Sequence, residues 1–526
     1  MDYGKTLNLP ETEFPMRAGL PQREPDFLKF WEENDIYGKK QALHAGHKKF
    51  VLHDGPPYAN GKIHMGHALN KILKDIIMKY KYARGFDTPY VPGWDTHGMP
   101  IEHAAIKELG LNRNELDPLT LRRKCHDFAL QWVDIQREDF KRLGVLGDWE
   151  NPYITLHHSF EAEQIRVFGT MANKGYIYKG KKTVYWCPHC ETALAEAEIE
   201  YGEQKTPTIF VKMPLVKDNG QTPEAAKGKK AYMVIWTTTP WTMPANVAVA
   251  LNPALEYAWV ECEGEVLFMA KDLLAQVGAV CHKDLSNILG TTLGKDMEFA
   301  ECVHPFPEYN NRRSLVVMAD YVTTETGTGL GHGCVHTAPG HGDVDFETGL
   351  KYKLPILCPV DSQGKLTEEA GERFKGMFVF DANIPVLKYL AELNCLLGKE
   401  NIKHQYAHCW RCKNPIIFRA TSQWFASIDG FRDEALKSID YVQWIPSWGQ
   451  QRIHNMVSDR HDWCISRQRV WGVPIPVFYC DNCGEHLINE ATIDSVANWF
   501  EKEGSDAWWA HTAEELLPEG TVCPKC

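Results

Sequence analysis

Residues 54–70 carry the run that decides the fold: Asp54-Gly55-Pro56-Pro57-Tyr58-Ala59-Asn60-Gly61-Lys62-Ile63-His64-Met65-Gly66-His67-Ala68-Leu69-Asn70. A short apolar stretch, Lys49 to His53, precedes the run, and apolar residues continue after it at helical spacing as far as Tyr80. This order predicts a strand, a loop rich in Gly and Pro, and then a helix. A nucleotide-binding α/β unit begins in the same way.

Two histidines, His64 and His67, stand at the predicted start of that helix. Backbone N–H groups at a helix amino terminus favour an anion, and imidazole groups add donors, so a triphosphate fits there. A small residue at Gly66 would let the backbone approach the ligand. Taken alone, the pair could also be a metal pair or two surface histidines.

A second apolar stretch, 89–92, ends in the loop Gly93-Trp94-Asp95-Thr96-His97-Gly98. Ligands of open parallel sheets bind at the carboxyl ends of strands, which makes this loop a candidate binding segment. Amphipathic helices are predicted over 25–37 and 118–143. Beyond Cys190 the sequence changes to short β-rich runs punctuated by Gly and Pro, which indicates an inserted domain.

The chain has 526 residues, too many for one hydrophobic core at about 100–200 residues per domain. We therefore predict a modular α/β protein with a Rossmann-like domain and a β-rich insertion. Its predicted segments are an N-terminal extension at 1–45, the first part of the Rossmann-like domain at 46–190, the inserted domain at 191–400, a return to the Rossmann-like domain at 401–475, and a zinc-ribbon-like segment at 476–526.

Composition places the protein in an ordinary globular class, with 44% hydrophobic and 24% charged residues. The amino terminus has early acids and no apolar core segment, so we expect neither a signal peptide nor a transit peptide. No run approaches the ~18 apolar residues of a membrane span, and the cytoplasm is the expected compartment. The net charge of −12 means that a nucleic-acid partner must meet local basic patches.

Eight of the sixteen cysteines form four Cys-x-x-Cys pairs: Cys187 with Cys190, Cys409 with Cys412, Cys480 with Cys483, and Cys523 with Cys526. The first two pairs flank the inserted domain, so one zinc ion could clamp the two strands by which the insertion leaves and re-enters. The last two pairs lie close enough in sequence for a second, ribbon-like site. We predict two structural zinc ions, with catalytic or redox thiols as the alternative.

Two further segments are rich in polar groups that could serve a site. Three threonines, Thr237 to Thr239, follow an apolar strand, and Asn246 adds an amide. Threonine runs are more often plain strand residues. The segment 333–345 is rich in Gly, His and Asp, which suggests a polar pocket. A metal site with the ligands His332, His336, His341 and Asp345 is one alternative for this segment.

The run at 54–70 closely resembles the first signature of the isoleucyl-tRNA synthetases, which are class I enzymes. The same family resemblance extends over three more motifs, at residues 92–98, 237–246 and 462–472. It implies a Rossmann-like catalytic domain that forms an isoleucyl adenylate from isoleucine and ATP with Mg²⁺. The residues that match the ATP-binding positions are Tyr58, Asn60, His64, Gly66 and His67. Gly55, Pro56 and Asp95 match the amino-acid pocket, where Asp95 would hold the substrate ammonium.

The resemblance also implies a second, hydrolytic site. Isoleucine and valine differ by one methylene, and the isoleucyl enzymes are the standard example of double-sieve editing for this reason. Thr237, Thr238, Thr239 and Asn246 match one side of the editing pocket. His336 would help to position the reacting end, and Asp345 would hold the ammonium of the misacylated valine. The family's loop usually has two adjacent acids, which Val344 separates here, and of the two only Asp345 aligns with the expected ammonium ligand.

The implied partners are isoleucine, ATP and tRNA(Ile), with no membrane, and a monomer is expected. Family members continue with a Lys-Met-Ser-Lys-Ser loop and an anticodon-binding domain. Neither is found in this sequence, so we expect a fragment. Two alternatives are a valyl-tRNA synthetase, which typically has arginine where Thr239 stands, and a stand-alone deacylase or zinc-dependent RNA-binding module. The intact loop from His64 to His67 disfavours the latter.

Overall fold

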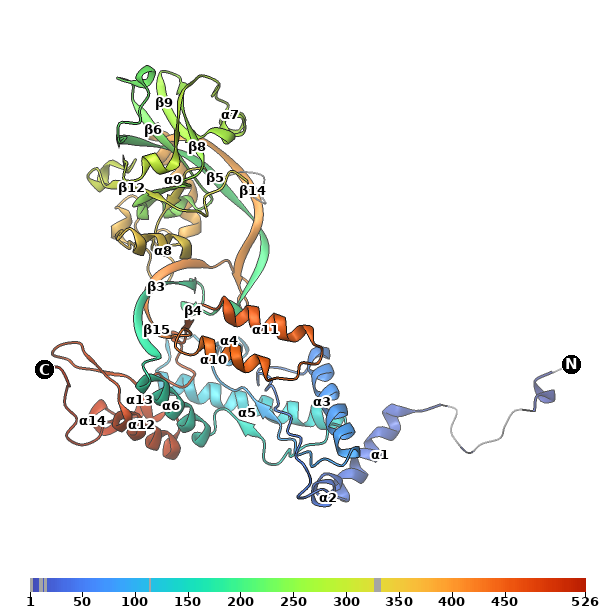
Figure 1. Ribbon diagram of the computed structural model, residues 1–526. Helices are drawn as coiled ribbons and strands as arrows, with labels where there is room; N and C mark the ends of the chain where they lie inside the picture. Colours follow the sequence, from blue (N-terminus) through green and yellow to red (C-terminus); the bar gives the residue numbers. More distant parts are fainter. Residues whose placement is uncertain (1–2, 9–12, 14–16, 113–114, 326–332) are drawn as a thin grey trace. The chain divides into compact units, whose positions relative to one another are not determined.

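The computed structural model describes residues 3–8, 13, 17–112, 115–325 and 333–526. It divides into two compact units (Figure 1): unit 1 comprises Met1–Asn173 with Arg469–Cys526, and unit 2 comprises Lys174–Gln468. In the described part of the chain, no helix combines the length and apolar character needed to cross a bilayer.

Unit 1 begins with helices where the sequence predicts a single helix over 25–37. The structure has α1 at Leu20–Glu33 and α2 at Ile36–Leu43. The break has a local cause. Asp35 adopts a left-handed φ of 45°, and its carboxylate accepts the Gly38 N–H, so the residue ends one helix and caps the next.

Short parallel strands form the centre of unit 1. β1 (Gly93–Trp94) pairs in parallel with β2 (Tyr153–Ile154), and single parallel bridges join Lys49 to Asp87 and Tyr58 to Asp95. The strand predicted over 49–53 is thus reduced to one bridge. The parallel direction agrees with the predicted α/β class. The helices that follow are α3 (Met65–Ala83), α4 (Met99–Leu109), α5 (Pro118–Arg142) and α6 (His158–Asn173).

Helix α3 has an unusual distribution of side chains. Its apolar stripe predicts a helix that packs by that stripe, yet Leu69 is 62% exposed and Tyr80 is 57% exposed. Its two buried residues are Lys71 and Met78. The buried face therefore includes a charged residue, which requires a partner for the ammonium group.

Unit 2 contains a closed ring of strands. The order in the ring is β6-β13-β7-β12-β11-β5, and β5 pairs back to β6. β9, β8 and β10 extend the sheet from β6, while β14 pairs with β5 along its length, and Figure 1 shows these two strands running side by side. The strands of this sheet are β5 (Ile199–Lys217), β6 (Ala231–Thr237), β7 (Ala248–Leu251), β8 (Glu256–Cys262), β9 (Glu265–Ala270), β10 (Ile288–Leu293), β11 (Glu301–Val303), β12 (Arg313–Met318), β13 (Val335–Thr337) and β14 (Leu396–Cys409).

Short helices cover this sheet, and apolar strand residues form its core. Those used below are η5 (Pro240–Ala245), α7 (Leu274–Cys281), α8 (Asp343–Lys351) and α9 (Val379–Glu392). The compact unit extends beyond the predicted insertion at 191–400 on both sides, because β3 (Ile177–Cys187) pairs with β15 (Ile417–Ala426). β4 (Thr192–Leu194) and β16 (Trp463–Cys464) complete that smaller sheet, and α10 (Arg432–Asp440) and α11 (Trp448–Ser458) follow β15.

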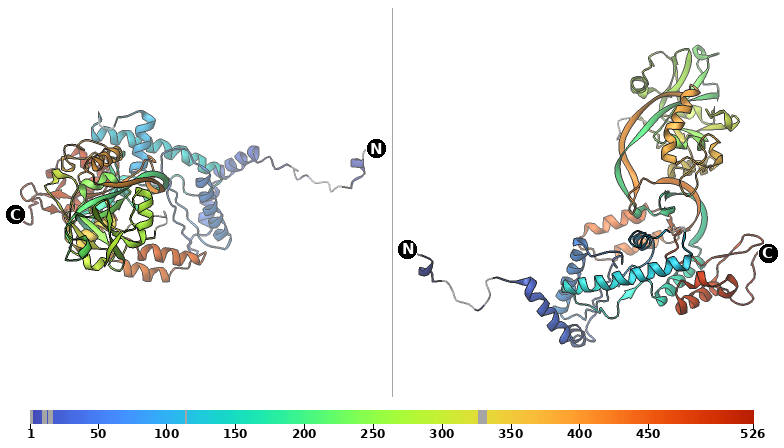
Figure 2. Two further views of the ribbon diagram at one scale, coloured as in Figure 1. Left: turned by 90° about the horizontal axis from the view of Figure 1, so that it is seen from above. Right: turned by 180° about the vertical axis from the view of Figure 1, so that it is seen from behind.

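The last part of unit 1, from Arg469 onward, contains the β17–β18 hairpin and small helices. These elements are β17 (Phe478–Tyr479), β18 (His486–Leu487), α12 (Glu490–Glu503), α13 (Ala507–Ala510) and α14 (Ala513–Leu516). Both views in Figure 2 show this segment at the carboxyl end of the chain. Helix α12 packs on α6, so the beginning and the end of the chain contribute to the same unit.

Candidate functional sites in the two units

The first candidate site lies at the amino terminus of α3, where His64 is the N-cap residue. The Gly66 N–H donates to His64 Nδ1 at 3.0 Å, and the His64 N–H donates to His67 Nδ1 at 3.3 Å. A backbone N–H is always a donor, so both Nδ1 atoms accept, and each neutral ring carries its proton on Nε2. The rings stack with their centroids 3.9 Å apart. Each histidine thus caps the helix through Nδ1 and has its N–H on Nε2.

Gly66 has a role in this geometry that the sequence did not reveal. A Cβ atom at this position would approach His64 Cε1 to 2.9 Å, closer than side chains tolerate. Glycine therefore allows His64 to fold over the first turn of α3. Burial lowers the pKa of His67, and the neighbouring His64 and Lys71 lower it further.

A cavity of about 360 Å³ lies beside these histidines. Six residues that the sequence predicts to bind ATP or the amino acid line it: Gly55, Pro56, Tyr58, His64, Gly66 and His67. Asn70 and Lys71 also line it, although the sequence reasoning missed both. Their spacing was the available signal, since residues three and four positions after His67 lie on the same helix face. A helix amino terminus, imidazoles and an ammonium group form a wall suited to phosphate.

The ammonium groups of Lys71 and Lys74 both contact the carboxylate of Asp54. Asp54 is 1% exposed, and Lys74 Nζ lies 2.8 Å from Asp54 Oδ1. The Gly93 N–H also donates to Asp54, at 3.0 Å. Burial alone would raise the pKa of Asp54, but the two ammonium groups outweigh it and hold the pKa below its usual value. This cluster joins the start of the loop, helix α3 and β1 around the cavity.

Asp95 and Asn60 do not line the cavity, although both were predicted to bind a substrate. Asp95 Oδ1 accepts the His97 N–H at 3.3 Å, which is a loop-capping bond. The Asp95 backbone pairs with the loop after Asp54: its N–H donates to Pro57 O, and its carbonyl accepts the Ala59 N–H. Asn60 Nδ2 donates to Pro100 O at 3.3 Å. The substrate roles of Asp95 and Asn60 stay predictions.

A segment near residue 470 fixes the loop that carries Asp95. Glu102 is fully buried and accepts from Arg469 at 3.0 Å and from the Trp471 N–H at 3.0 Å. Trp471 Nε1 donates to Thr96 O at 2.8 Å, and the Gly98 N–H donates to Trp471 O. The family motif at 462–472 thereby contributes to unit 1, and Glu102 is a further residue that sequence reasoning missed.

The second candidate site lies in unit 2, where hydrogen bonds connect η5, β7, β12 and β13. Asn246 Nδ2 donates to His336 Nδ1 at 2.8 Å and to Ala248 O at 3.0 Å. The other amide atom, Oδ1, accepts from the Ser314 hydroxyl. His336 Nε2 then carries the proton and donates to Thr242 Oγ1 at 2.9 Å. Both ring nitrogens of His336 are therefore engaged within the protein.

The predicted threonines extend this network. The Thr242 hydroxyl donates to Thr239 O at 2.7 Å, and the Thr237 and Thr239 hydroxyls lie 3.3 Å apart. Thr238 lies half-buried in the turn between β6 and η5. The structure thus brings together Thr237, Thr239, Asn246 and His336 and adds two residues not predicted, Thr242 and Ser314. Burial lowers the pKa of His336 to about 3, so its ring is neutral at physiological pH.

Asp345 lies in the first turn of α8, and one of its carboxylate oxygens accepts a hydrogen bond from the backbone. Its Oδ2 atom accepts the Ala338 N–H at 2.8 Å. Burial raises the pKa of Asp345 to about 6, although the hydrogen bond from Ala338 acts in the opposite direction. Asp343 instead accepts from the Thr183 hydroxyl of β3 at 2.9 Å. The two acids therefore have different partners, and the substrate role of Asp345 stays a prediction.

A metal site in this segment gains no support. Among the described residues, the clusters able to hold a metal ion are formed by cysteines and include neither His336 nor Asp345. His332, the remaining predicted ligand of that alternative, lies outside the described residues. His341 Nδ1 is 3.0 Å from Phe418 O and so donates to a backbone carbonyl.

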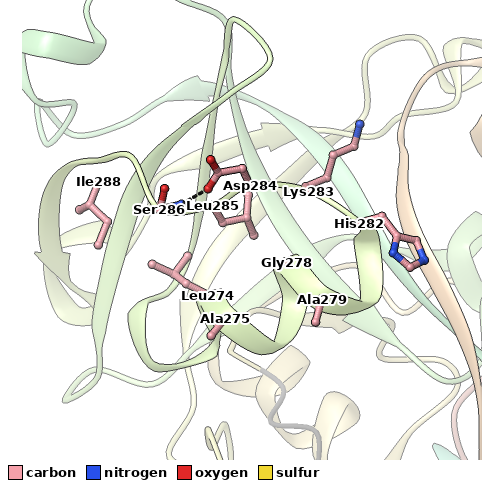
Figure 3. A pocket seen from close by; sticks show the side chains of 10 residues that line it. All are labelled: Leu274, Ala275, Gly278, Ala279, His282, Lys283, Asp284, Leu285, Ser286 and Ile288. Atoms are coloured by element: carbon pink, nitrogen blue, oxygen red, sulfur yellow. Dashed lines mark hydrogen bonds between the residues drawn. The ribbon is translucent and has the colours of Figure 1, made fainter.

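A larger cavity in unit 2, of about 640 Å³, lies beside α7. Figure 3 shows Leu274, Ala275 and Ala279 of the helix on one side and Leu285 and Ile288 on the other. Lysine 283 in this wall is paired with Glu263 at 2.6 Å. None of the residues predicted to act in catalysis or binding lines this cavity. Its size alone gives it no role.

The cysteine pairs meet as the sequence predicts. Cys187, Cys190, Cys409 and Cys412 form one cluster, and Cys480, Cys483, Cys523 and Cys526 form another, with all sulfur atoms of a cluster within 4.8 Å of one another. The Sγ atoms of Cys187 and Cys412 are 3.5 Å apart, far longer than a disulfide bond of about 2.05 Å. Tetrahedral Zn²⁺ with Zn–S bonds of about 2.3 Å would space sulfur atoms by roughly 3.8 Å. Both clusters could hold zinc.

Comparison with known proteins identifies the family of this chain. The family model of the class I tRNA synthetases (I, L, M and V) matches residues 26–523. The chain belongs to this family. The predicted Rossmann-like class I catalytic fold and the resemblance to synthetases are thereby confirmed.

Among members of this family, the chain is similar to curated isoleucine–tRNA ligases. The isoleucine–tRNA ligase of Caldicellulosiruptor saccharolyticus is 59% identical, over 100% of this chain and 56% of the relative. That of Moorella thermoacetica is 58% identical, over 100% of this chain and 55% of the relative. The synthetase chain therefore spans about half the length of these relatives. The chain is also similar to a solved LeuRS–tRNA–LeuAMS complex from Agrobacterium radiobacter K84, at 17% identity and a TM-score of 0.36, over 90% of this chain and 52% of the solved chain.

Proposed function

We propose that this synthetase chain belongs to an enzyme that activates isoleucine with ATP and Mg²⁺, transfers it to tRNA(Ile), and hydrolyses valine from misacylated tRNA(Ile). The observation that carries the first part is the cavity at the amino terminus of α3. Its lining combines both histidines of the signature with Gly55, Pro56 and Tyr58 of the preceding loop. The identity of 59% to an isoleucine–tRNA ligase supports isoleucine as the amino acid.

Adenylate formation needs positioning and charge stabilisation more than covalent help. The carboxylate of isoleucine attacks the α-phosphorus of ATP, and the bond from that phosphorus to the bridging oxygen of pyrophosphate breaks. The Nε2–H groups of His64 and His67 would donate to phosphate oxygens as charge develops. Lys71 adds positive charge to the same wall. Asp95 would bind the substrate ammonium.

A titration distinguishes isoleucine from valine as the bound amino acid. Isoleucyl-sulfamoyl-adenosine, a stable analogue of the adenylate, is titrated into the chain and compared with the valyl analogue. We expect the isoleucyl analogue to bind at least about fivefold more tightly, because one methylene is worth ~1–3 kcal/mol in an apolar pocket. Equal affinities would contradict the isoleucine assignment. Tighter binding of the valyl analogue would favour the valyl alternative.

The hydrolytic part rests on unit 2. Its Thr–His–Asn network includes His336 of β13, and Asp345 is a half-buried carboxylate suited to an ammonium group. In the reaction, a water oxygen bonds to the ester carbon and the bond from that carbon to the ribose oxygen breaks. One water proton ends on the ribose oxygen. Thr237, Thr238 and Thr239 would exclude the larger isoleucyl group.

Hydrolysis of Val-tRNA(Ile) by the chain tests this assignment. Asp345→Ala should lower the rate by about 100-fold, because the substrate ammonium loses its carboxylate partner. Glu347→Ala is the matched control, since Glu347 is an exposed acid of the same helix. Unchanged hydrolysis in Asp345→Ala would refute the editing assignment.

Zinc is the metal that the cysteine clusters fit best, because four thiolates at this spacing favour tetrahedral Zn²⁺. The first cluster would fasten the ends of β3 and β14, and the second would close the carboxyl-terminal segment. Native mass spectrometry should find two zinc ions per chain. Any other stoichiometry would contradict the pairing. The monomeric state and the cytoplasmic location stay predictions.

A further inference from the structure

His341 differs from the other histidines at the two candidate sites. Its Nδ1 atom lies 3.0 Å from Phe418 O, and a carbonyl oxygen can only accept, so the proton is on Nδ1. The lone pair is therefore on Nε2. By contrast, His64, His67 and His336 accept on Nδ1 and carry their protons on Nε2.

The Nε2 atom of His341 is buried and has no hydrogen-bond partner among the described residues. A buried polar atom without a partner is uncommon in native proteins and calls for a bound group. Burial also lowers the pKa of His341 to about 4, which keeps the ring neutral and its lone pair available near pH 7. Because Nε2 carries the lone pair, it can bind only a hydrogen-bond donor.

His341 lies next to the Thr–His–Asn network of unit 2. Its ring makes an edge-on contact with Trp241 of η5, with centroids 5.0 Å apart. Trp241 directly precedes Thr242, which accepts the bond from His336. His336 cannot itself bind an attacking water through a ring nitrogen, because Asn246 and Thr242 occupy both nitrogens. A group other than the ring of His336 must therefore accept a water hydrogen in the proposed hydrolysis.

We propose that Nε2 of His341 binds and orients the attacking water of the hydrolytic site. This inference rests on the editing function proposed above and names the group that holds the water. His341 acts as a hydrogen-bond acceptor. The water oxygen attacks the ester carbon, the bond to the ribose oxygen breaks, and the released proton ends on that oxygen. No proton remains on the imidazole.

Three variants separate this role from a structural one. In His341→Asn, the short amide can still donate to Phe418 O while the acceptor at the Nε2 position is lost. His341→Gln places an amide near the Nε2 position and loses the donor to Phe418. His408→Asn is the matched control, because His408 Nδ1 also donates to a backbone carbonyl, Tyr406 O at 2.8 Å, on β14.

Single-turnover hydrolysis of Val-tRNA(Ile) is the readout. His341→Asn should lower the maximal rate by roughly 100-fold and leave the half-saturating concentration unchanged, as expected for a misplaced reactant. His341→Gln should recover part of the rate, and His408→Asn should match the unsubstituted chain. A rate for His341→Asn within twofold of the unsubstituted chain would overturn the proposal, as would loss in proportion to a lowered thermal midpoint.

A second measurement does not depend on hydrolysis. Nitrogen-15 and carbon-13 NMR of histidine-labelled chain should show His341 in the Nδ1–H form, with an Nε2 shift that reports a bound hydrogen. An Nε2–H form would overturn the proposal. If the unsubstituted chain fails to release valine while NMR finds the Nδ1–H form, the editing function fails and the water-binding geometry stands.

Discussion

The two units each present a pair of histidines, and the pairs lie in opposite surroundings. His64 and His67 cap α3 beside an open cavity. His336 is buried and His341 half-buried among strands and short helices, where loss of solvent lowers the pKa of His336 to about 3 and of His341 to about 4. A histidine at a helix amino terminus can donate to an anion, whereas a buried neutral histidine orders polar groups and water. Under the proposed function, the same residue type would therefore serve phosphate in one unit and ester hydrolysis in the other.

The largest difference between the two units is expected at Asp54, the buried carboxylate beside His64 and His67 in unit 1. Asp54→Asn should destabilise unit 1 by about 3–5 kcal/mol, because two ammonium groups lose their buried partner. Hydrogen exchange of the α3 amides during denaturation would measure it. Asp134→Asn is the control, since its ion pair with Arg137 is 72% exposed on the Asp134 side and is worth about 0–1 kcal/mol. Equal effects of the two substitutions would refute the role given to Asp54.

The stability of unit 2 should depend instead on the uncharged Thr–His–Asn network. Asn246→Ala leaves His336 Nδ1, the Ser314 hydroxyl and Ala248 O without their partner, at an expected cost of about 2–3 kcal/mol. The measurement is denaturant unfolding of unit 2. Asn287→Ala, which removes an exposed amide bonded to Glu261, should change stability by less than about 0.5 kcal/mol. A small effect of Asn246→Ala would show that the network is not stabilising.

The exposed pair should affect ligand binding more than stability. His64→Ala removes a donor and the N-cap of α3, so we expect about tenfold weaker binding of pyrophosphate and a loss of about 1 kcal/mol in stability. Calorimetric titration measures the affinity. His47→Ala is the control, because His47 is an exposed histidine away from the cavity. Unchanged affinity in His64→Ala would break the assignment of phosphate to unit 1.

The two units should also respond to pH in opposite directions. The pKa of Asp345 is raised to about 6, so its carboxylate form, and with it hydrolysis, should fall about tenfold by pH 5. The pKa of His67 is lowered, so its positive charge appears only as the pH falls, and its contribution to pyrophosphate binding should grow. Rates and affinities from pH 7.5 to 5 test both slopes, with His67→Ala as the reference. A hydrolysis rate and a pyrophosphate affinity that change in the same direction with pH would contradict the opposite responses expected of the two units.

Local sequence patterns predicted the helices and strands better than they predicted how those elements pack in the folded chain. The helix predicted over 118–143 is α5 at Pro118–Arg142, because its apolar spacing and N-cap are local. The apolar stripe of α3 predicted a helix correctly but gave no warning that Lys71 would be buried and Leu69 exposed. That outcome depends on Asp54, which lies outside the helix. The strand over 49–53 kept a single bridge, because its pairing is set by residues far along the chain.

In the candidate sites too, residues that are close in sequence were easier to predict than residues that only folding brings together. The contiguous motif at 54–67 placed most of the cavity lining, since its residues are neighbours in sequence. The unit 2 network joins Asn246, Ser314 and His336 across as many as 90 residues, and only folding brings them together. Thr242 and Ser314 look like ordinary strand or turn residues in sequence. Motif resemblance located His336, but the engagement of both its nitrogens required the structure.

The most direct test of the two-site account is the rate at which the chain releases valine and isoleucine from tRNA(Ile). With Val-tRNA(Ile) and Ile-tRNA(Ile) as parallel substrates, we expect valine to be released at least about tenfold faster, because in the proposed pocket the threonines at 237–239 would exclude the larger side chain. His64→Ala should leave both rates unchanged. Equal release of the two amino acids, or loss of release in His64→Ala, would contradict the account.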